Sequence, residues 1–372
     1  MATVISGGEP AIRASHERVN EQRRGDLAVP ELSAAQIREQ LGLGVDRVVS
    51  EGSLYDRDLA ARAIKQAQGD LVEAAFLVRA FRATLRRFGV SEPIKTGEMA
   101  VRRRVAPIFK EPPGGQFLGA TYDYVHRFIE FERHAEDPDL DAGQPAFEDG
   151  GSSAVDMSAI EQSFGALIEE DLLEPLPTVG KPDEPAADLT RTPLTFPTRR
   201  DTRLQALARA DEGYLFCLAY SSLRGYGRNH PYIADLRIGE VAVAFVIPEI
   251  GLTVTLGAIT VTECQTVHQP GGVPGTPPCF TRGYGLVLGQ CERKAISIAL
   301  LDRSLRAQEL EEEPMLPTQD EELVLANCDN VSSAGLVQHL KLPHYVDFKG
   351  QLRILRQKRA EFDRARADRA AE

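Results

Sequence analysis

The chain has 372 residues, of which 42% are hydrophobic and 26% charged, a composition typical of a globular protein with one large or two moderate domains. No apolar run approaches the roughly 20 residues needed to cross a bilayer, and the N-terminal part is polar and charged. We therefore expect no export, no membrane association and a cytoplasmic location. The five cysteines are scattered and form no Cys-x-x-Cys pair. That pattern argues against a disulfide framework, a zinc ribbon and an iron–sulfur cluster held by this chain alone.

The net charge of −12 is concentrated in one segment. Seventeen acidic residues lie between Glu130 and Asp188 against only Arg133 and Lys181, which leaves the rest of the chain near +3. No sustained basic stripe with interleaved aromatic residues occurs, so we expect no nucleic-acid partner. The prolines and acidic residues of 134–198 predict a surface excursion with a short helix near 160–173 and little part in the chemistry.

The first 95 residues have a helical pattern. Ser33 is the predicted N-cap of a helix whose apolar positions recur at helical spacing as far as Val48. Gly69 followed by Asp70 predicts a helix end and a new N-cap. The next helix should end at Gly89 and bury one apolar stripe. That stripe consists of Val72, Phe76, Leu77, Phe81, Leu85 and Phe88.

From about residue 200 the sequence again has clear signals for helices and strands. A helix is expected near 200–208, and Asp211 is the predicted N-cap of another that runs to Leu223. Two β-branched runs, 236–247 and 252–262, are joined by a short polar turn and predict an antiparallel hairpin. Further helices are expected at 289–307, at 331–341 and from 351 onward.

These elements predict an α+β fold with a helical N-terminal region and a C-terminal region in which an antiparallel hairpin or sheet is packed by helices. There is no βαβ alternation to support a doubly wound sheet. The arginine run 102–104 is expected to form a solvated strand or a face for a partner, or else a phosphate site. The predicted regions are 1–95, a connecting region 96–199 with the acidic excursion at about 134–188, an α+β region 200–348 that carries the site, and a charged C-terminal helix 349–372.

Two histidines flank a proline in the segment 338–348. His339 and His344 would point about 140° apart on an unbroken helix. Pro343 ends that helix, so His344 enters from an extended segment and the two rings can converge on one divalent ion, with zinc as first choice. Asp347 offers a supporting carboxylate or a further ligand. Catalytic zinc normally takes three protein ligands, so the missing ligand must come from elsewhere in the fold, from a substrate or from another chain. The alternative is that two histidines merely flank a helix end.

The tetrapeptide Arg-Gly-Tyr-Gly occurs twice, at 224–227 and 282–285. The second copy is expected to open a helix, where glycines let backbone N–H groups approach a phosphate and arginine adds a bidentate clamp. Neither copy matches a Walker A loop or a dinucleotide fingerprint, and each taken singly can be a simple turn. The candidate triphosphate-binding residues are Arg224, Gly225, Gly227, Arg228, Arg282, Gly283, Gly285, Arg293 and Lys294.

These segments resemble subunit I of the bacterial carbon–phosphorus lyase core complex. The likeness covers nearly the whole chain, except the acidic stretch around 134–188 and the extended charged tail. The segments that carry it are 7–9, 23–26, 113–116, 211–214, 224–231, 280–287, 292–295 and 339–348.

The resemblance implies a role in phosphonate catabolism. The family's complex, with subunits G and H and an ATP-binding-cassette-like accessory protein, replaces the purine of ATP with methylphosphonate and gives ribose 1-methylphosphonate 5-triphosphate. Subunit I alone is implied to be a nucleosidase that releases the base from ATP or GTP. The resemblance also implies that His339 and His344 bind metal at the interface with the radical-SAM subunit J, and that the iron–sulfur chemistry belongs to that partner. We expect two copies of the chain in each complex.

Displacement of a base at the anomeric carbon passes through an oxocarbenium-like state, as glycoside hydrolysis does. It needs a carboxylate near C1′, an acid for the departing purine and cations for the triphosphate of the magnesium nucleotide. Glu212 and Glu263 are the candidate carboxylates, and His230 is the candidate acid. Each of them can instead cap a helix or pair with an arginine.

Two other functions remain open. The chain can be a scaffold that lends His339 and His344 to a site whose chemistry resides in other subunits. It can also be a stand-alone metallohydrolase acting on phosphate esters, although no third histidine lies near the pair and no His-x-x-x-His or paired-aspartate pattern occurs.

Overall fold

The computed structural model describes residues 8–112, 114–129, 167–168, 170–175, 187–224, 230–271, 275 and 277–371. The chain forms two compact units, Met1–Asp329 (unit 1) and Asn330–Glu372 (unit 2). Unit 1 combines helices with a four-stranded antiparallel sheet, and unit 2 holds two helices. The predicted α+β fold is confirmed, whereas the division into four regions stays a prediction.

The sheet of unit 1 has the strand order β1-β2-β3-β4, with each neighbouring pair antiparallel. The predicted hairpin is confirmed and is longer than expected, because β2 and β3 stay paired from Ile247 and Leu252 at the turn back to Pro231 and His268. The strands are β1 Ala100–Val105, β2 Pro231–Ile247, β3 Leu252–Gly271 and β4 Cys279–Leu288.

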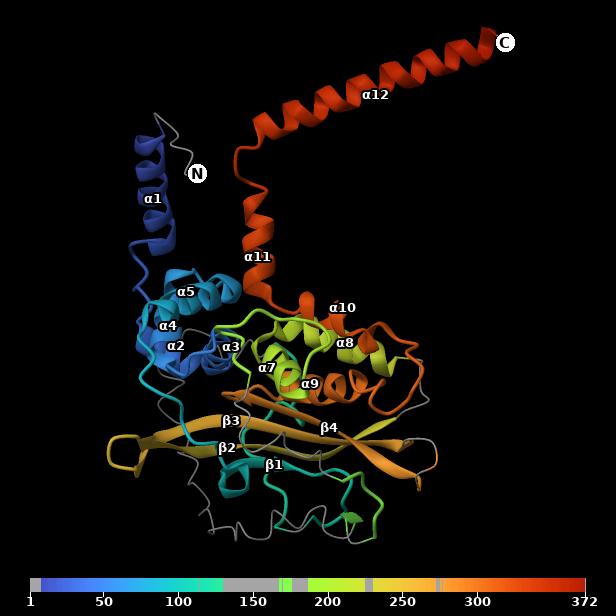
Figure 1. Cartoon of the computed structure of the whole chain (residues 1–372). Coiled ribbons are helices and arrows are strands. Elements are labelled where there is room, and N and C mark those ends of the chain that lie inside the picture. Colours follow the sequence, from blue (N-terminus) through green and yellow to red (C-terminus); the bar gives the residue numbers. More distant parts are fainter. Residues whose placement is uncertain are drawn as a thin grey trace. The chain divides into compact units, whose positions relative to one another are not determined.

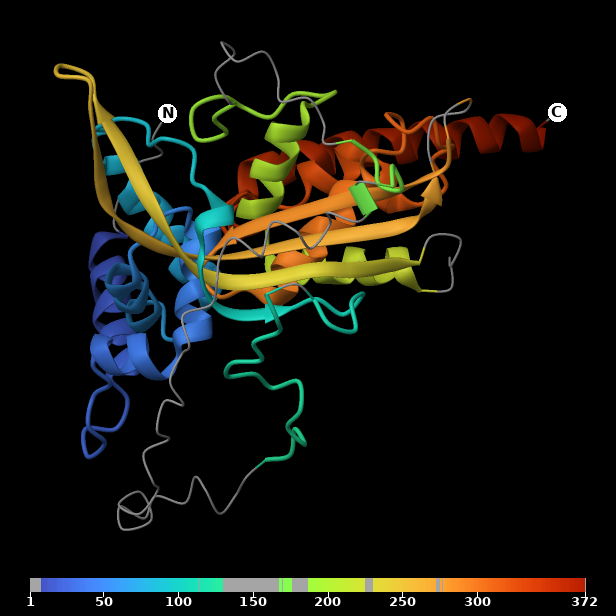
Figure 2. The ribbon, with the colours of Figure 1, turned by 90° about the horizontal axis from the view of Figure 1, so that it is seen from below.

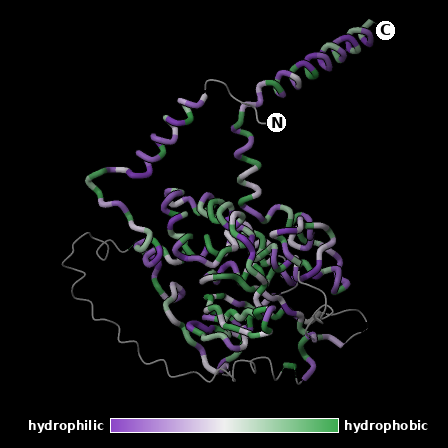
Figure 3. Tube along the Cα trace, turned by 60° about the vertical axis from the view of Figure 1, so that its left-hand side comes forward, coloured by the Kyte–Doolittle hydropathy of each residue, from purple (hydrophilic) through white to green (hydrophobic). Residues whose placement is uncertain are grey.

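Three helices cover one face of this sheet, as Figures 1 and 2 show. They are α7 Arg200–Arg209, α8 Glu212–Leu223 and α9 Glu292–Ser304. Asp211 caps α8 by accepting a hydrogen bond from the backbone N–H of Tyr214, as predicted. The larger core lies between these helices and the strands, where Leu215 and Ile298 meet Cys264, and hydrophobic residues gather there in Figure 3.

The N-terminal helices build a second, smaller core around Val45, Val49 and Ile64. The single helix predicted from Ser33 to Val48 is wrong. Ser33 forms a capping box as expected, but the helix breaks at Leu41, and a second helix begins at Gly42. The elements are α1 Glu9–Arg24, α2 Ala34–Gln40, α3 Gly42–Gly52, α4 Arg57–Gln66 and α5 Leu71–Thr84.

Helix α5 begins with Asp70 as its N-cap, as predicted, but it ends at Thr84, before Gly89. Its buried face is also different from the predicted one, because it consists of Ala74, Ala75 and Val78. Val78 packs so closely against Gly52 of α3 that a Cβ on this glycine would lie 2.6 Å from its side chain. Small residues therefore face the neighbouring helix, and the large ones are left outside. The exposed large residues are Phe76, Phe81, Leu85 and Phe88.

The predicted solvated arginines of β1 are mostly buried. Arg104 is fully buried and pairs with Asp235 of β2 at 3.1 Å, and Arg103 pairs with Glu292 at 2.6 Å. Arg102 alone of the three is exposed. Buried guanidinium groups need carboxylate partners, and these partners come from sequence positions more than 100 residues away.

Most of the acidic excursion, with the predicted short helix near 160–173, lies outside the described residues. Its described end, however, packs on the sheet, since Leu173 forms a bridge with Phe280 of β4. The short helix α10 Glu321–Ala326 completes unit 1.

Unit 2 consists of α11 Asn330–His339 and α12 Tyr345–Ala371, so both predicted C-terminal helices are confirmed, and the second begins earlier than expected. Neither helix has a buried residue. Among the described residues, no helix is long and apolar enough to cross a membrane.

Candidate functional site

The two histidine rings of unit 2 meet, as their spacing around the proline predicts. Helix α11 ends at His339 and α12 begins at Tyr345, so that His344 lies in the short connection between them. The two Nε2 atoms are 3.1 Å apart, and the rings stand nearly perpendicular, at 82°, with centroids 4.8 Å apart. His339 is exposed and His344 is half-buried. The pair therefore faces outward, where a ligand or another chain can reach it.

The geometry of this pair fits a metal ion. With Zn–N distances of 2.0–2.1 Å, two nitrogens on a tetrahedral zinc lie about 3.3 Å apart. The Nδ1 of His344 is 2.5 Å from the carbonyl oxygen of Leu342, and a hydrogen on Nδ1 leaves the lone pair of Nε2 for a ligand. Among the described residues, no group of three or more His, Cys, Asp or Glu side chains could hold a metal, so Asp347 does not complete the site.

Glu212 and Arg293 are brought together at the start of α8 and α9, with an ion pair of 3.0 Å. Arg293 is exposed, with 73% of its side chain accessible, whereas Glu212 is largely buried. The backbone N–H of Glu212 donates to Glu51, whose carboxylate also binds Arg47. This group is therefore a helix-terminal charge cluster with one arginine open to solvent.

Lys294 follows Arg293 but points into the core. It is fully buried, and its ammonium donates to the hydroxyl of Ser50 at 2.8 Å. Burial lowers the pKa of Lys294, while the nearby carboxylates of Glu51 and Glu212 favour its charged form. In this position the lysine holds α3 against α9, and its predicted role toward a triphosphate stays a prediction.

The second Arg-Gly-Tyr-Gly copy is not a loop before a helix, as the sequence suggested. It lies within β4, and α9 begins only at Glu292. The glycines are needed because the strand runs against α9. A Cβ on Gly283 would lie 2.0 Å from the carbonyl oxygen of Ala299, and one on Gly285 would lie 2.2 Å from that of Ala295.

Arg282 in the same strand is half-buried, and burial lowers its pKa. Its backbone N–H donates to the carboxylate of Glu174, and its carbonyl oxygen accepts from Arg306 at 2.9 Å. Arg306 and Glu174 also pair directly, at 2.7 Å. This arginine therefore belongs to a buried network that ties residues 173–174 to β4 and the C-terminal end of α9.

Glu263 is the more deeply buried of the two candidate carboxylates. It pairs with Arg237 on the neighbouring strand and accepts a hydrogen bond from the hydroxyl of Tyr284 at 3.0 Å. Burial raises the pKa of Tyr284, and the carboxylate of Glu263 adds to that shift. Glu263 and Glu212 thus have different partners, and the structure does not join them in one cluster of described side chains.

The first Arg-Gly-Tyr-Gly copy is only partly described. Gly225, Gly227 and Arg228 lie outside the described residues. Arg224 follows the last turn of α8 and is exposed. His230, the candidate acid, is exposed and stacks on Tyr232 with ring centroids 4.8 Å apart.

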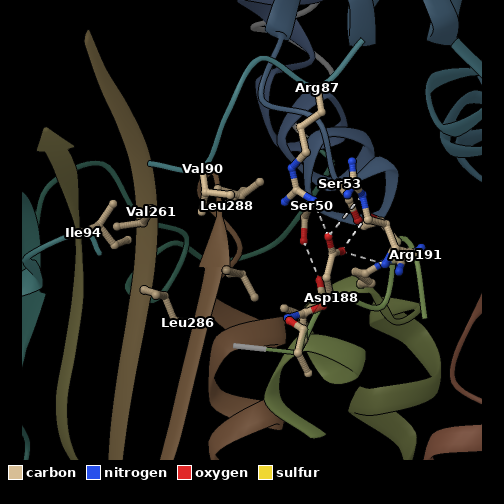
Figure 4. Close-up of a pocket in the computed structure, with 16 residues that line it drawn as sticks. Ser50, Ser53, Arg87, Val90, Ile94, Asp188, Arg191, Val261, Leu286 and Leu288 are labelled. Carbon is tan, nitrogen blue, oxygen red and sulfur yellow. Dashed lines mark hydrogen bonds and ion pairs between the residues drawn. The ribbon is translucent and has the colours of Figure 1, made fainter. Parts of the chain in front are cut away.

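A cavity of about 740 Å³ opens beside β3 and β4 (Figure 4). Its polar wall holds Arg87, Arg191 and Arg209 around Asp188, and its apolar wall holds the strand residues Val261, Leu286 and Leu288 together with Val90 and Ile94. The carboxylate of Asp188 is 2.6 Å from Arg87 and 4.0 Å from Arg191. The hydroxyl of Thr190 and then the guanidinium of Arg87 hold the pKa of Asp188 down, at about 2.

Sequence reasoning missed this cavity. Its residues come from α3, from the segment after α5, from 187–191, from α7 and from two strands, so no local spacing joins them. One signal was available in Asp188-Leu-Thr190, since Asp followed by Thr two residues later is typical of a side-chain turn.

The chain is similar to known proteins along almost its whole length. The model of a family described as bacterial phosphonate metabolism protein (PhnI) matches residues 1–362. The chain is 50% identical over 367 residues to the alpha-D-ribose 1-methylphosphonate 5-triphosphate synthase subunit PhnI of Rhizobium meliloti (strain 1021), covering 99% of this chain and 97% of the relative.

Two further relatives are similar along almost their full length. The protein of the same name from Escherichia coli (strain K12) is 49% identical over 363 residues, which cover 97% of this chain and 99% of the relative. A putative C-P lyase subunit protein HtxH of Stutzerimonas stutzeri is 41% identical over 357 residues, which cover 95% and 94%. The chain belongs to the PhnI family of bacterial phosphonate metabolism proteins.

Proposed function

We propose that this chain is a subunit of a carbon–phosphorus lyase complex and takes part in displacing the purine of ATP by methylphosphonate, which gives ribose 1-methylphosphonate 5-triphosphate. The observation that carries the proposal is the 50% identity, along 99% of the chain, to a protein named as a subunit of the synthase of this compound. The proposed partners are subunits G, H and J and the ATP-binding-cassette-like accessory subunits.

We further propose that the chain alone cleaves the N-glycosidic bond of ATP or GTP. The bond between C1′ and the base nitrogen breaks, the base leaves with a proton, and water takes the place that methylphosphonate takes in the complex. Of the predicted side chains, Glu212 and Arg293 best suit a ligand, because they are in contact and Arg293 is open to solvent. Glu263 is a weaker candidate, since its partners Arg237 and Tyr284 already occupy both of its carboxylate oxygens.

The histidine pair supplies two ligands of a proposed metal site. His339 and His344 present two nitrogens at a separation that zinc accepts, and the third ligand comes from another chain or from a substrate. When bound there, a zinc ion would act as a Lewis acid toward a phosphoryl or phosphonate oxygen.

The test of the nucleosidase proposal is an incubation of the purified full-length chain with MgATP and with MgGTP, followed by chromatography of the products. Free purine and ribose 5-triphosphate are expected. Intact nucleotide with the chain alone, and with subunits G and H added, would refute the cleavage chemistry.

One observation favours a second candidate function, that of a scaffold which lends the histidine pair to a site shared with the radical-SAM subunit. Unit 2 leaves its large apolar side chains in solvent from Leu336 to Phe348, on both sides of the histidines. Such a face is normally covered by a partner. If the isolated chain releases no base but the assembled complex does, and if His339→Gln abolishes the activity of the complex, the scaffold function is favoured.

A further inference from the structure

We propose that the cavity beside β3 and β4 is the nucleoside triphosphate site of this chain, with Arg87, Arg191 and Arg209 binding the polyphosphate and the strand residues packing against the purine. This inference rests on the proposed function, because it names where that substrate binds. None of these residues was among the triphosphate candidates that the sequence suggested.

The polar wall carries an excess of positive charge. Three arginines line it against the single carboxylate of Asp188. Burial lowers the pKa of Arg209, and the nearby charges of Arg79 and Arg82 lower it further. The carboxylates of Asp329 and Asp188 act in the opposite direction. An anion bound in the cavity would offset the repulsion among the arginines, which lowers the stability of the ligand-free protein.

Two polar atoms of the wall are buried without a hydrogen-bond partner in the described structure. They are the Nε of Arg209 and the hydroxyl oxygen of Ser53. Ser53 ends α3 in a left-handed conformation, with φ of 54°, and this places its side chain on the cavity wall. Buried polar atoms in native proteins nearly always have hydrogen-bond partners. In this proposal, oxygen atoms of the ligand are the partners of these two atoms.

Arg87 and Arg191 are already oriented as a phosphate would need them. Both guanidinium groups turn toward one carboxylate, that of Asp188 (Figure 4). A carboxylate and a phosphate accept hydrogen bonds from guanidinium groups in the same way. Because Asp188 accepts hydrogen bonds from the backbone N–H and the hydroxyl of Thr190, its carboxylate is held in place and fixes the position of Arg87, with which it pairs at 2.6 Å.

The opposite wall favours a nucleotide over a free polyphosphate. Val261, Leu286 and Leu288 present apolar side chains from adjacent strands, and Ile94 extends this wall. A purine packs well on such a surface, whereas inorganic triphosphate gains nothing from it. The volume of about 740 Å³ lies within the 300–1,000 Å³ typical of sites for small ligands.

The test measures binding by isothermal titration calorimetry on the full-length chain, with MgATP, adenosine and inorganic triphosphate as separate probes. MgATP should bind at least tenfold more tightly than either part. The double variant Arg87→Gln/Arg191→Gln should weaken MgATP binding at least tenfold. Both side chains are substantially exposed, at 42% and 64%, so the variant should fold.

Two further variants make the test specific. Arg86→Gln removes the same charge from the neighbouring exposed residue, which does not line the cavity, and should leave the affinity unchanged. Val90→Asp places a charge on the apolar wall and should weaken MgATP while affecting inorganic triphosphate much less. Equal binding of MgATP by the native chain and the double variant, or no MgATP binding by the native chain, would overturn the inference.

The outcomes separate this inference from the proposed function. If binding depends on Arg87 and Arg191 but the chain and its complex release no base, the site is supported and the proposed chemistry fails. If base release proceeds at the native rate in the double variant, the chemistry is supported and this site assignment is wrong.

Discussion

The two units of the molecule treat charged and apolar side chains in opposite ways. Unit 1 buries many ionisable groups, and several of these pair with a distant part of the chain, as Arg104 does with Asp235 and Arg306 does with Glu174. Unit 2 has no buried residue in either helix, and it leaves Leu340, Tyr345 and Phe348 in solvent.

Because of this difference, a charged residue in a motif has a different meaning in each unit. In unit 1 an arginine or glutamate in a suggestive motif is mostly committed to holding the fold, so we place the proposed ligand site where such networks leave a surplus of positive charge, in the cavity around Arg209. In unit 2 the histidine pair is held by local contacts, such as that of His344 with the carbonyl oxygen of Leu342, and neither helix has a buried residue, so the surface around the pair is available to a partner. The four predictions below test this contrast, in the order of their expected effect on stability.

The largest effect is expected where β4 touches α9. Gly285→Val should destabilise unit 1 by more than about 3 kcal/mol, because the added side chain meets the backbone of Ala295, which cannot move aside without displacing the helix. Urea denaturation followed by circular dichroism measures this. The matched control is Gly335→Ala in unit 2, where a Cβ has open space and the unfolding free energy of unit 1 should not change.

The next largest effect concerns the buried ion pair of the sheet. Glu263→Gln should cost about 3 kcal/mol in unfolding free energy, since it leaves the buried guanidinium of Arg237 without its counter-charge. Glu212→Gln should cost less than Glu263→Gln, because its ion-pair partner Arg293 is exposed. Equal losses in the two variants, measured by urea denaturation, would contradict the contrast between buried and open pairs.

A moderate effect is expected from a buried histidine of β3. Burial, with help from Arg303 and Arg306, lowers the pKa of His268 from 6.5 to about 3. Below pH 6.5 the unfolded chain therefore takes up a proton that the native chain takes up only near pH 3. Stability is fully present above pH 6.5 and falls as the pH decreases, by at most about 1.4 kcal/mol per pH unit from this group.

The measurement is the unfolding free energy between pH 5 and 7, where few carboxylates titrate. His268→Gln removes the proton-uptake difference and should flatten the slope in this range. A slope that persists unchanged in the variant would assign the proton uptake to another group.

The smallest effect on stability is expected at the histidine pair, where the effect on ligand binding should be the greatest. His339→Gln and His344→Gln should leave the unfolding free energy within about 0.5 kcal/mol of the native value, since His339 is exposed and His344 is only half-buried. Each variant should lose zinc binding in a calorimetric titration of the full-length chain. The control His16→Gln, on the exposed helix α1, should bind zinc as the native chain does. Unchanged zinc binding in these two variants would refute the proposed metal site.

Much of the fold could be predicted because its signals are local. The caps Ser33, Asp70 and Asp211 bond to backbone groups two or three residues away, so their short motifs are enough. Two of the wrong assignments share one cause. The phenylalanines of α5 and the glycines of β4 were placed by periodicity and motif, but the neighbouring helix decides which face of each element is packed.

The family of this protein and its α+β class could be predicted from the sequence alone. So could the meeting of His339 with His344, because a proline and five residues of chain suffice to bring those rings together. Only the tertiary structure decided that Lys294 and Glu263 are buried in networks, and that Arg87, Asp188 and Leu286 share one cavity. The contacts of Lys294 and of the cavity join segments about 100 or more residues apart, and those of Glu263 cross between neighbouring strands. No spacing along the chain encodes which charge or apolar wall a side chain will meet.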